Sequence, residues 1–238
     1  MKQNQLYEVL KEFTLEDALL LETYDRQYKA LKRLHRELKN NELFLKLVVV
    51  NALLSYQLPN KGEVYWENFG SFFAKNPSLE KFGEFLKKYN NRFLNSKLQR
   101  LQKVLKAIKK MEREELIRFC KNPKELLDYL SNLLNQEKTA KTLVFAVKMF
   151  IYACRIASGK NITAPFEIEI PLDVRLRKIS DSLEFWRNLS IKTNIPPLHL
   201  DTLIWVTMGA DKRFLENLPT GLKDKVKKLK EVLKELLL

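Results

Sequence analysis

The residues from Asp128 to Arg175 carry the most informative pattern in this sequence. It opens with Asp128-Tyr-Leu-Ser-Asn-Leu-Leu134 and Asn135-Gln-Glu-Lys138, continues as an apolar run to Ile156, and closes, after a loop, with Pro171-Leu-Asp173-Val-Arg175. This pattern predicts a helix, a short hairpin, a second helix, a loop and the start of a third helix. It places Lys141 in the first turn of the second helix and Asp173 at the start of the third.

These two positions suggest a reactive pair. A free lysine amine has a pKa near ~10.4 and is almost wholly protonated at neutral pH. The partial positive charge at a helix start disfavours a second positive charge, and desolvation by neighbours such as Phe145 and Ala146 acts in the same direction. A neutral lysine amine attacks carbon to form a Schiff base. The carboxylate of Asp173 could stabilise developing positive charge or accept a proton.

The composition predicts an all-α protein with a sizeable core. The 238 residues include only 6 glycines and 8 prolines, 45% are hydrophobic, and Leu, Lys and Glu dominate. The length suits one domain, or two small lobes that share a cleft. The 43 basic and 29 acidic residues leave a net charge of +14. Such an excess often serves solubility, but it also indicates a polyanionic partner such as nucleic acid.

Other sequence signals restrict the class of protein. The two cysteines, Cys120 and Cys154, lie in or beside apolar helical runs, and without an export signal we expect reduced, packed thiols in a cytosolic protein. His35 and His199 have no metal-ligand spacing, so we expect no metal site. The N-terminus has no long apolar segment, and the apolar run from Leu43 to Leu54 is too short to span a bilayer. We therefore expect a cytoplasmic protein without a membrane anchor.

Several further elements follow from the pattern. Thr14 caps a predicted helix that runs to about Leu38 and has a basic side. The aromatic residues around Trp66, and Trp186 with its apolar neighbours, are expected to lie in the core. A basic amphipathic run between Arg92 and Arg113 is read as a solvated face that could flank a DNA backbone.

The residues Lys141-Thr-Leu-Val-Phe145-Ala-Val-Lys148 and Ile170-Pro-Leu-Asp173-Val-Arg175 resemble the helix-hairpin-helix DNA glycosylases, and most closely their archaeal-type 8-oxoguanine DNA glycosylase/lyase branch. The resemblance covers most of the chain. It implies a single glycosylase domain over residues 1–238, with two helical subdomains flanking a cleft. The helix-hairpin-helix motif would span residues 124–157. The loop that contains the catalytic aspartate would span residues 158–175.

The resemblance also implies roles for side chains. Lys141 and Asp173 would be catalytic, and Lys138 and Arg175 would contact the DNA backbone. Residues that bind the extruded base would be Gln27, Trp66, Phe145, Lys148, Asp201 and Trp205. Among these, Trp66, Phe145 and Trp205 would form stacking walls. The hairpin Asn135-Gln-Glu-Lys138 departs from the glycine-rich turn of the superfamily, which makes an atypical hairpin and a point-charge contact from Lys138 the expectation.

The function that follows is removal of 8-oxoguanine through a lysine Schiff base, with strand cleavage at the abasic site by β-elimination. We expect a monomeric base-excision enzyme that needs no cofactor and acts on DNA with the chromosome. Three alternatives stay open: a glycosylase of the same fold for another damaged base, a non-catalytic helical DNA-binding protein, and a basic helical adaptor for a protein or membrane. A glycosylase for another damaged base would not need Lys141. A non-catalytic DNA-binding protein would leave the order of Lys141 and Asp173 unexplained.

Overall fold

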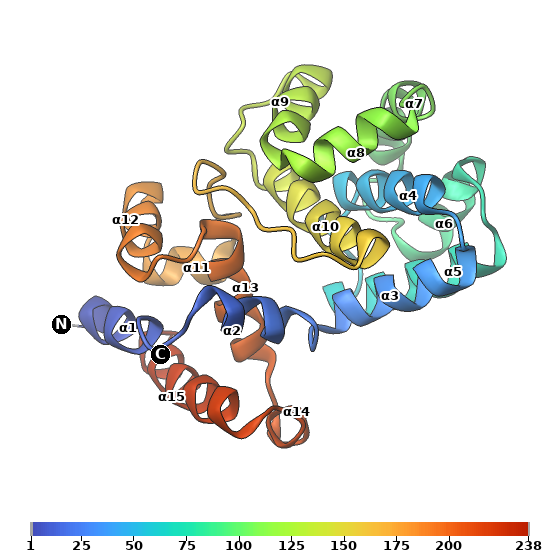
Figure 1. The fold of residues 1–238 in the computed structure, drawn as a ribbon. Helices are drawn as coiled ribbons and strands as arrows, with labels where there is room; N and C mark the ends of the chain where they lie inside the picture. Colours follow the sequence, from blue (N-terminus) through green and yellow to red (C-terminus); the bar gives the residue numbers. More distant parts are fainter. Residues whose placement is uncertain (1, 238) are drawn as a thin grey trace. The chain divides into compact units, whose positions relative to one another are not determined.

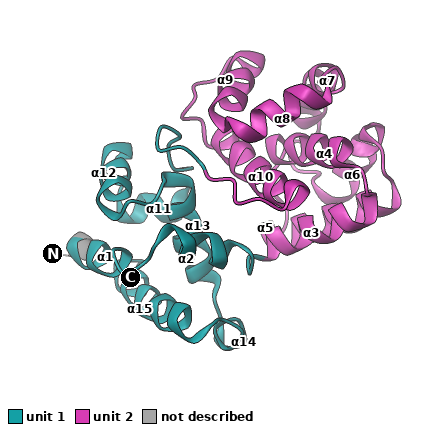
Figure 2. Cartoon of the chain, viewed as in Figure 1, with its two compact units in different colours: residues 1–25, 164–238 teal, residues 26–163 magenta. Residues whose placement is uncertain are grey.

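The computed structural model describes residues 2–237, and within this range it contains helices and no strand (Figure 1). The all-α prediction is confirmed. The chain divides into two compact units, and the first is discontinuous: it combines residues 1–25 with residues 164–238, whereas residues 26–163 form the second (Figure 2). The chain thus leaves unit 1 once, builds all of unit 2, and returns.

Unit 1 is built around α13 and α15. Its helices are α1 (Lys2–Leu10), α2 (Leu15–Glu22), α11 (Val174–Ile179), α12 (Leu183–Thr193), α13 (Pro197–Gly209), α14 (Lys212–Glu216) and α15 (Thr220–Leu237). Helix α13 packs on α2, α12 and α15, and α1 also packs on α15. Trp186 is fully buried in this core, as the sequence predicted. Removal of such apolar surface from water is the main source of stability.

Unit 2 is built around two helices that are buried on nearly every side, α4 and α10. Its elements are α3 (Arg26–Leu38), α4 (Asn41–Leu53), α5 (Gly62–Lys75), a 3-10 turn (Leu79–Lys81), α6 (Phe82–Tyr89), α7 (Leu94–Ile108), α8 (Arg113–Lys121), α9 (Pro123–Leu134) and α10 (Lys141–Ser158). Every residue from Phe44 to Leu53 is buried, and α4 packs along α10. A helix that is apolar around its whole circumference is expected at such a central position.

The predicted helix from Thr14 to Leu38 is wrong as a single element. Helix α2 ends at Glu22 and α3 begins at Arg26. In the break, the Thr23 hydroxyl donates to the carbonyl of Leu20 at 2.7 Å. Such a hydroxyl-to-backbone bond competes with helix continuation. The break matters because it is where the chain passes from unit 1 to unit 2.

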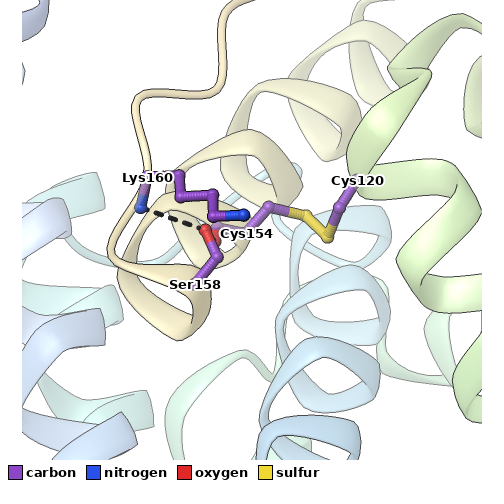
Figure 3. Close-up of a disulfide and its surroundings, with 4 residues drawn as sticks. All are labelled: Cys120, Cys154, Ser158 and Lys160. Atoms are coloured by element: carbon purple, nitrogen blue, oxygen red, sulfur yellow. Dashed lines mark hydrogen bonds between the residues drawn. A yellow bond between two sulfur atoms is a disulfide. The ribbon is translucent and has the colours of Figure 1, made fainter.

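The expectation of reduced thiols is also wrong. Cys120 of α8 and Cys154 of α10 form a disulfide, with their Cα atoms 5.6 Å apart (Figure 3). The prediction relied on the rarity of disulfides in reducing compartments, a rule with known exceptions among hyperthermophiles. The two cysteines are 34 residues apart, and only the packing of α8 on α10 brings them together.

A knot of buried polar side chains ties the loop after α4 to the loop before α7. The side-chain amide of Asn90 donates to the Leu54 carbonyl at 2.8 Å and to the Tyr65 hydroxyl at 3.3 Å. The Lys97 amine donates to the side-chain oxygen of Asn90 and, at 3.5 Å, to the carbonyl of Gln57. Asn90 and Lys97 are both fully buried. Their burial is tolerable because their polar atoms are paired.

Burial lowers the pKa of the Lys97 amine from 10.5 to about 8, and the nearby charge of Arg92 acts in the same direction. Below pH 8, the amine is protonated in both the folded and the unfolded chain, and the folded chain carries the cost of a buried charge. Between pH 8 and pH 10.5, the unfolded chain binds more protons than the folded one. Lys97 therefore contributes a rise in the free energy of unfolding with pH across this window.

We expect Lys97→Met to abolish this rise, because methionine cannot titrate. The test is urea denaturation at pH 7.5, 9 and 10.5, which gives the free energy of unfolding at each pH. Lys103 is an exposed lysine on the same helix, so Lys103→Met serves as the control and should keep the wild-type slope. Equal slopes for Lys97→Met and wild type would contradict the assignment.

We expect the double substitution Cys120→Ser and Cys154→Ser to lower the free energy of unfolding by about 3 to 4 kcal/mol, because the cross-link closes a loop whose entropy the unfolded chain otherwise regains. Denaturation of wild type with and without reductant provides the comparison. Reduced wild type should match the double variant, and the variant should not respond to reductant. A wild-type protein that is equally stable under both conditions would refute this contribution.

Candidate active site

Lys141 is the first residue of α10, as predicted, and it is exposed. The N-cap residue, Ala140, has no side chain that could satisfy the first amides of the helix. Those amides therefore contribute a partial positive charge beside the Lys141 amine. One turn later, Phe145 is half-buried and Ala146 is fully buried. Lys141 thus stands at the exposed end of a helix whose body is fixed in the core.

The hairpin before Lys141 is closed by its own hydrogen bonds. Asn135 adopts the left-handed conformation, with φ of 50°. The Ser131 hydroxyl donates to the carbonyl of Gln136 at 2.6 Å, and the amide of Ala140 donates to Glu137 at 2.9 Å. Asparagine tolerates this backbone region better than other residues with a Cβ. This chemistry explains how the turn forms without the glycines of the superfamily pattern.

Arg100 of α7 fixes the hairpin to the rest of unit 2. Its guanidinium donates to the side-chain oxygen of Gln136 at 2.9 Å and to the carbonyl of Leu53 at 3.0 Å. Burial lowers the pKa of Arg100 from its ordinary value, but an arginine stays charged in proteins. A charged donor makes stronger hydrogen bonds than a neutral one. Arg100 therefore holds the segment that leads into Lys141.

Lys138, predicted to contact phosphate, pairs with Asp128 at 2.7 Å, and Asp128 also accepts from Lys124 at 3.2 Å. The hydrogen bond from Lys138 is the main reason that the pKa of Asp128 is lowered. Both side chains of the Lys138–Asp128 pair are substantially exposed. An exposed pair of this kind contributes ~0–1 kcal/mol and is screened by salt. It therefore poses little barrier to a contact between Lys138 and phosphate.

Four predicted base-binding residues lie in unit 2, and three of them are almost completely buried. Gln27 of α3 is 4% exposed, Trp66 of α5 is 0% exposed and Lys148 of α10 is 5% exposed. The rings of Trp66 and Phe145 meet edge to face, with centroids 6.2 Å apart. The indole nitrogen of Trp66 is buried and has no acceptor among the described residues. Unit 2 thus holds one aromatic pair among the predicted residues, Trp66 and Phe145, and keeps the side chains of Gln27 and Lys148 out of water.

Gly62, which the sequence did not single out, packs against the side chain of Gln27. It opens α5 one turn before Trp66. A Cβ atom on Gly62 would lie 3.3 Å from the side-chain nitrogen of Gln27. Glycine therefore allows the close approach of α5 to the Gln27 amide.

The other predicted residues lie in unit 1. Asp173 caps α11, as predicted: one carboxylate oxygen accepts from the amides of Arg175 and Leu176, both at 2.9 Å. Such bonds fix the position of the carboxylate at the start of the helix. The guanidinium carbon of Arg175 lies 3.9 Å from the ring centroid of Trp205, a cation–π contact. Asp201, one turn before Trp205 on α13, is 8% exposed.

A buried histidine anchors the loop that leads to Asp173. The Ala164 amide donates to Nε2 of His199 at 2.9 Å, so the proton of the neutral ring is on Nδ1. That nitrogen lies 2.6 Å from a carboxylate oxygen of Glu22. His199 and Glu22 are almost completely buried. Nothing local in the sequence marks this link, because the two residues are 177 positions apart.

No group of three metal-ligating side chains is found in residues 2–237, and no helix in the same range has both the length and the apolar character needed to cross a bilayer.

Comparison with known proteins decides the family. A family model described as AGOG: N-glycosylase/DNA lyase matches residues 7–236. The chain belongs to this family. The match covers both units, including every residue that the sequence assigned to the site. The predicted enzyme class, a bifunctional DNA N-glycosylase and lyase, is confirmed.

Individual relatives agree with this assignment. The N-glycosylase/DNA lyase of Thermococcus kodakarensis is 38% identical over 231 residues, which cover 91% of this chain and 88% of the relative. The one from Nanoarchaeum equitans is 43% identical over 204 residues, covering 85% and 89%. A crystal structure of Pa-AGOG, an 8-oxoguanine DNA glycosylase from Pyrobaculum aerophilum complexed with 8-oxoguanosine, matches with a TM-score of 0.78 at 27% identity, covering 95% of this chain and 96% of that one.

The close packing at Gly62 makes a prediction about Gln27. We expect Gly62→Ala to displace the Gln27 amide by a few tenths of an ångström and to slow base excision severalfold, with little change in stability. Gly83→Ala is the matched control, because a Cβ atom there meets nothing within 4 Å. Gly83 lies in α6, so its replacement should raise stability by up to ~1 kcal/mol and leave excision unchanged. Unchanged single-turnover excision by Gly62→Ala would argue against a role for Gln27.

Proposed function

We propose that this enzyme removes 8-oxoguanine from DNA and then cleaves the strand at the abasic site. The observation that carries the proposal is the placement of Lys141 and Asp173 at helix starts in a member of the N-glycosylase/DNA lyase family. The 8-oxoguanosine bound by the Pyrobaculum aerophilum relative supports the choice of lesion. Helices α9 and α10 with their hairpin form the proposed helix-hairpin-helix motif.

In the proposed reaction, the Lys141 amine attacks C1′ of the damaged nucleotide. The bond from C1′ to N9 of the base breaks, its electron pair leaves with the base, and a bond from C1′ to the lysine nitrogen forms. The lysine nitrogen gives up one proton to the departing base and one to O4′ as the C1′–O4′ bond breaks, so the sugar ring opens and a Schiff base between the lysine nitrogen and C1′ forms. Loss of a proton from C2′ then expels the 3′ phosphate, which is β-elimination. The Asp173 carboxylate stabilises the positive charge that develops on the sugar.

Base selection is proposed to use the buried polar groups. 8-Oxoguanine carries a proton at N7 and a carbonyl at C8, so an acceptor must face N7 and donors must face its oxygens. Gln27, Lys148 and Asp201 supply both kinds of group. Phe145 and Trp205 are the proposed stacking walls. The family resemblance gives Trp66 a stacking role. Its buried indole N–H has no acceptor among residues 2–237, so we propose that it also donates a hydrogen bond to the bound base.

The remaining expectations follow from this activity. Lys138 and Arg175 are proposed to contact DNA phosphates, which position the duplex without reading its sequence. We propose that the enzyme acts as a monomer, with the chromosome in the cytoplasm of a prokaryotic cell. No cofactor enters the proposed reaction.

Borohydride trapping tests the proposal directly. Wild type should form a covalent adduct with a duplex that contains 8-oxoguanine and none with the matched guanine duplex. Lys141→Ala should form no adduct, because the nucleophile is absent. Asp173→Asn should bind the duplex with wild-type affinity but lose most base release, since the charge that stabilises the sugar cation is gone.

Two results would contradict these assignments. An adduct of equal yield with Lys141→Ala would exclude Lys141 as the nucleophile, and unchanged base release by Asp173→Asn would exclude a catalytic role for Asp173. A panel of duplexes with other single lesions tests the remaining alternative of the same fold. Faster release of an alkylated base than of 8-oxoguanine would favour that alternative.

A further inference from the structure

Phe93 is an anomaly in unit 2. Its side chain is 66% exposed, and its backbone is left-handed, with φ of 53°. Among residues 2–237, the non-glycine residues with a positive φ are Lys39, Gln57, Phe93, Asn135 and Asn194. Phe93 is the aromatic residue among these five. A bulky residue in this region is a genuine outlier, and strained residues cluster at functional sites. The fold therefore tolerates both an unfavourable backbone and an apolar ring in water at this position.

The segment that holds Phe93 is braced on both sides. Before it, Asn90 is tied to the carbonyl of Leu54 at 2.8 Å, and Arg92 donates to the carbonyl of Leu58 at 3.1 Å. After it, the buried Lys97 bonds back to Asn90. These bonds fix the backbone around Phe93 and so the point from which its ring projects. An exposed apolar side chain on a rigid support is suited to entering a partner, because little conformational entropy is lost on contact.

Phe93 is also connected to the hairpin that leads into Lys141. It is the N-cap of α7, and Arg100 of the same helix bonds to Gln136 in the hairpin. Seven residues of helix correspond to about 10 Å along the axis. Arg92 adds a positive charge next to the ring. The ring, the arginine and the hairpin therefore belong to one rigid part of unit 2.

We propose that Phe93 enters the base stack of duplex DNA and fills the space that the extruded nucleotide leaves. This inference rests on the proposed function, since an enzyme that acts on a base must first take it out of the duplex. Extrusion costs stacking free energy, and apolar side chains that insert between base steps are a known way to offset it. Aromatic rings stack on any base, so the contact needs no particular sequence. Arg92 would meet the phosphates on either side.

Other exposed apolar residues lack this combination. Ile117 on α8 is 42% exposed and Ile191 on α12 is 60% exposed, but both lie within helices and have ordinary backbone conformations. Scattered apolar residues of this kind are normal on a protein surface.

The test variant is Phe93→Asn, because asparagine removes the ring and tolerates the left-handed backbone. We expect its melting temperature to be no lower than that of wild type. Single-turnover excision of 8-oxoguanine should fall at least tenfold on duplex DNA and change less than twofold on the single-stranded oligonucleotide, which has no duplex to open. Phe93→Tyr should retain the wild-type rate on the duplex, and the control Ile117→Ala should match wild type on both substrates.

An equal loss of rate on both substrates, or no loss on the duplex, would overturn the proposal. A binding measurement separates it from the choice of lesion, because it requires no base release. Wild type should bind a duplex with a tetrahydrofuran abasic analogue more tightly than the intact duplex. Phe93→Asn should lose this preference at least fivefold and keep its affinity for the intact duplex. A preference that persists in Phe93→Asn, or that wild type does not show, would refute insertion of the ring.

Discussion

The packing of α4 along α10 is the constraint on which the rest of unit 2 depends. Residues Leu143 to Arg155 of α10 are buried with the exception of the half-buried Phe145, so neither the axis nor the rotation of this helix can change without opening the core. Lys141 stands at the exposed end of the same helix. A nucleophile must be held in a defined place to react efficiently. The core fixes the backbone from which the proposed nucleophile, Lys141, projects, and the Arg100 bonds to the hairpin and to the end of α4 restrain the chain that leads into it.

The features that the sequence predicted well are those set by local chemistry. An aspartate before an apolar helical run forms its own cap, so Asp173 could be placed at a helix start without knowledge of the fold. Lys141 could be placed in the first turn of a helix because the apolar residues that follow it recur at helical spacing. The aromatic residues around Trp66 and the side chain of Trp186 were expected to be buried because few other arrangements can hide so much apolar surface, and they are buried.

The features that sequence reasoning missed depend on contacts between distant segments. A continuous helical pattern gave no reason to interrupt the helix at Thr23, because the break reflects the passage of the chain between two cores. The Cys120–Cys154 bond depends on how α8 meets α10. The contact between His199 and Glu22 joins segments from opposite ends of the chain. A pattern of neighbouring residues contains no information about such long-range contacts. It does contain the signals for helix caps and for the helical spacing of apolar residues.

Tyr65 and Trp66 are adjacent on α5, but they differ in whether the chain satisfies their buried polar atoms. Both side chains are fully buried on α5. The Tyr65 hydroxyl donates to Asn51 at 2.6 Å and accepts from Asn90, so the chain satisfies it completely. The Trp66 indole N–H has no acceptor in the described part of the chain, and such a buried donor costs ~1–3 kcal/mol. An acceptor supplied by a bound base would remove that cost. The edge-to-face contact between Trp66 and Phe145 puts this donor beside a ring that is proposed to stack on the base.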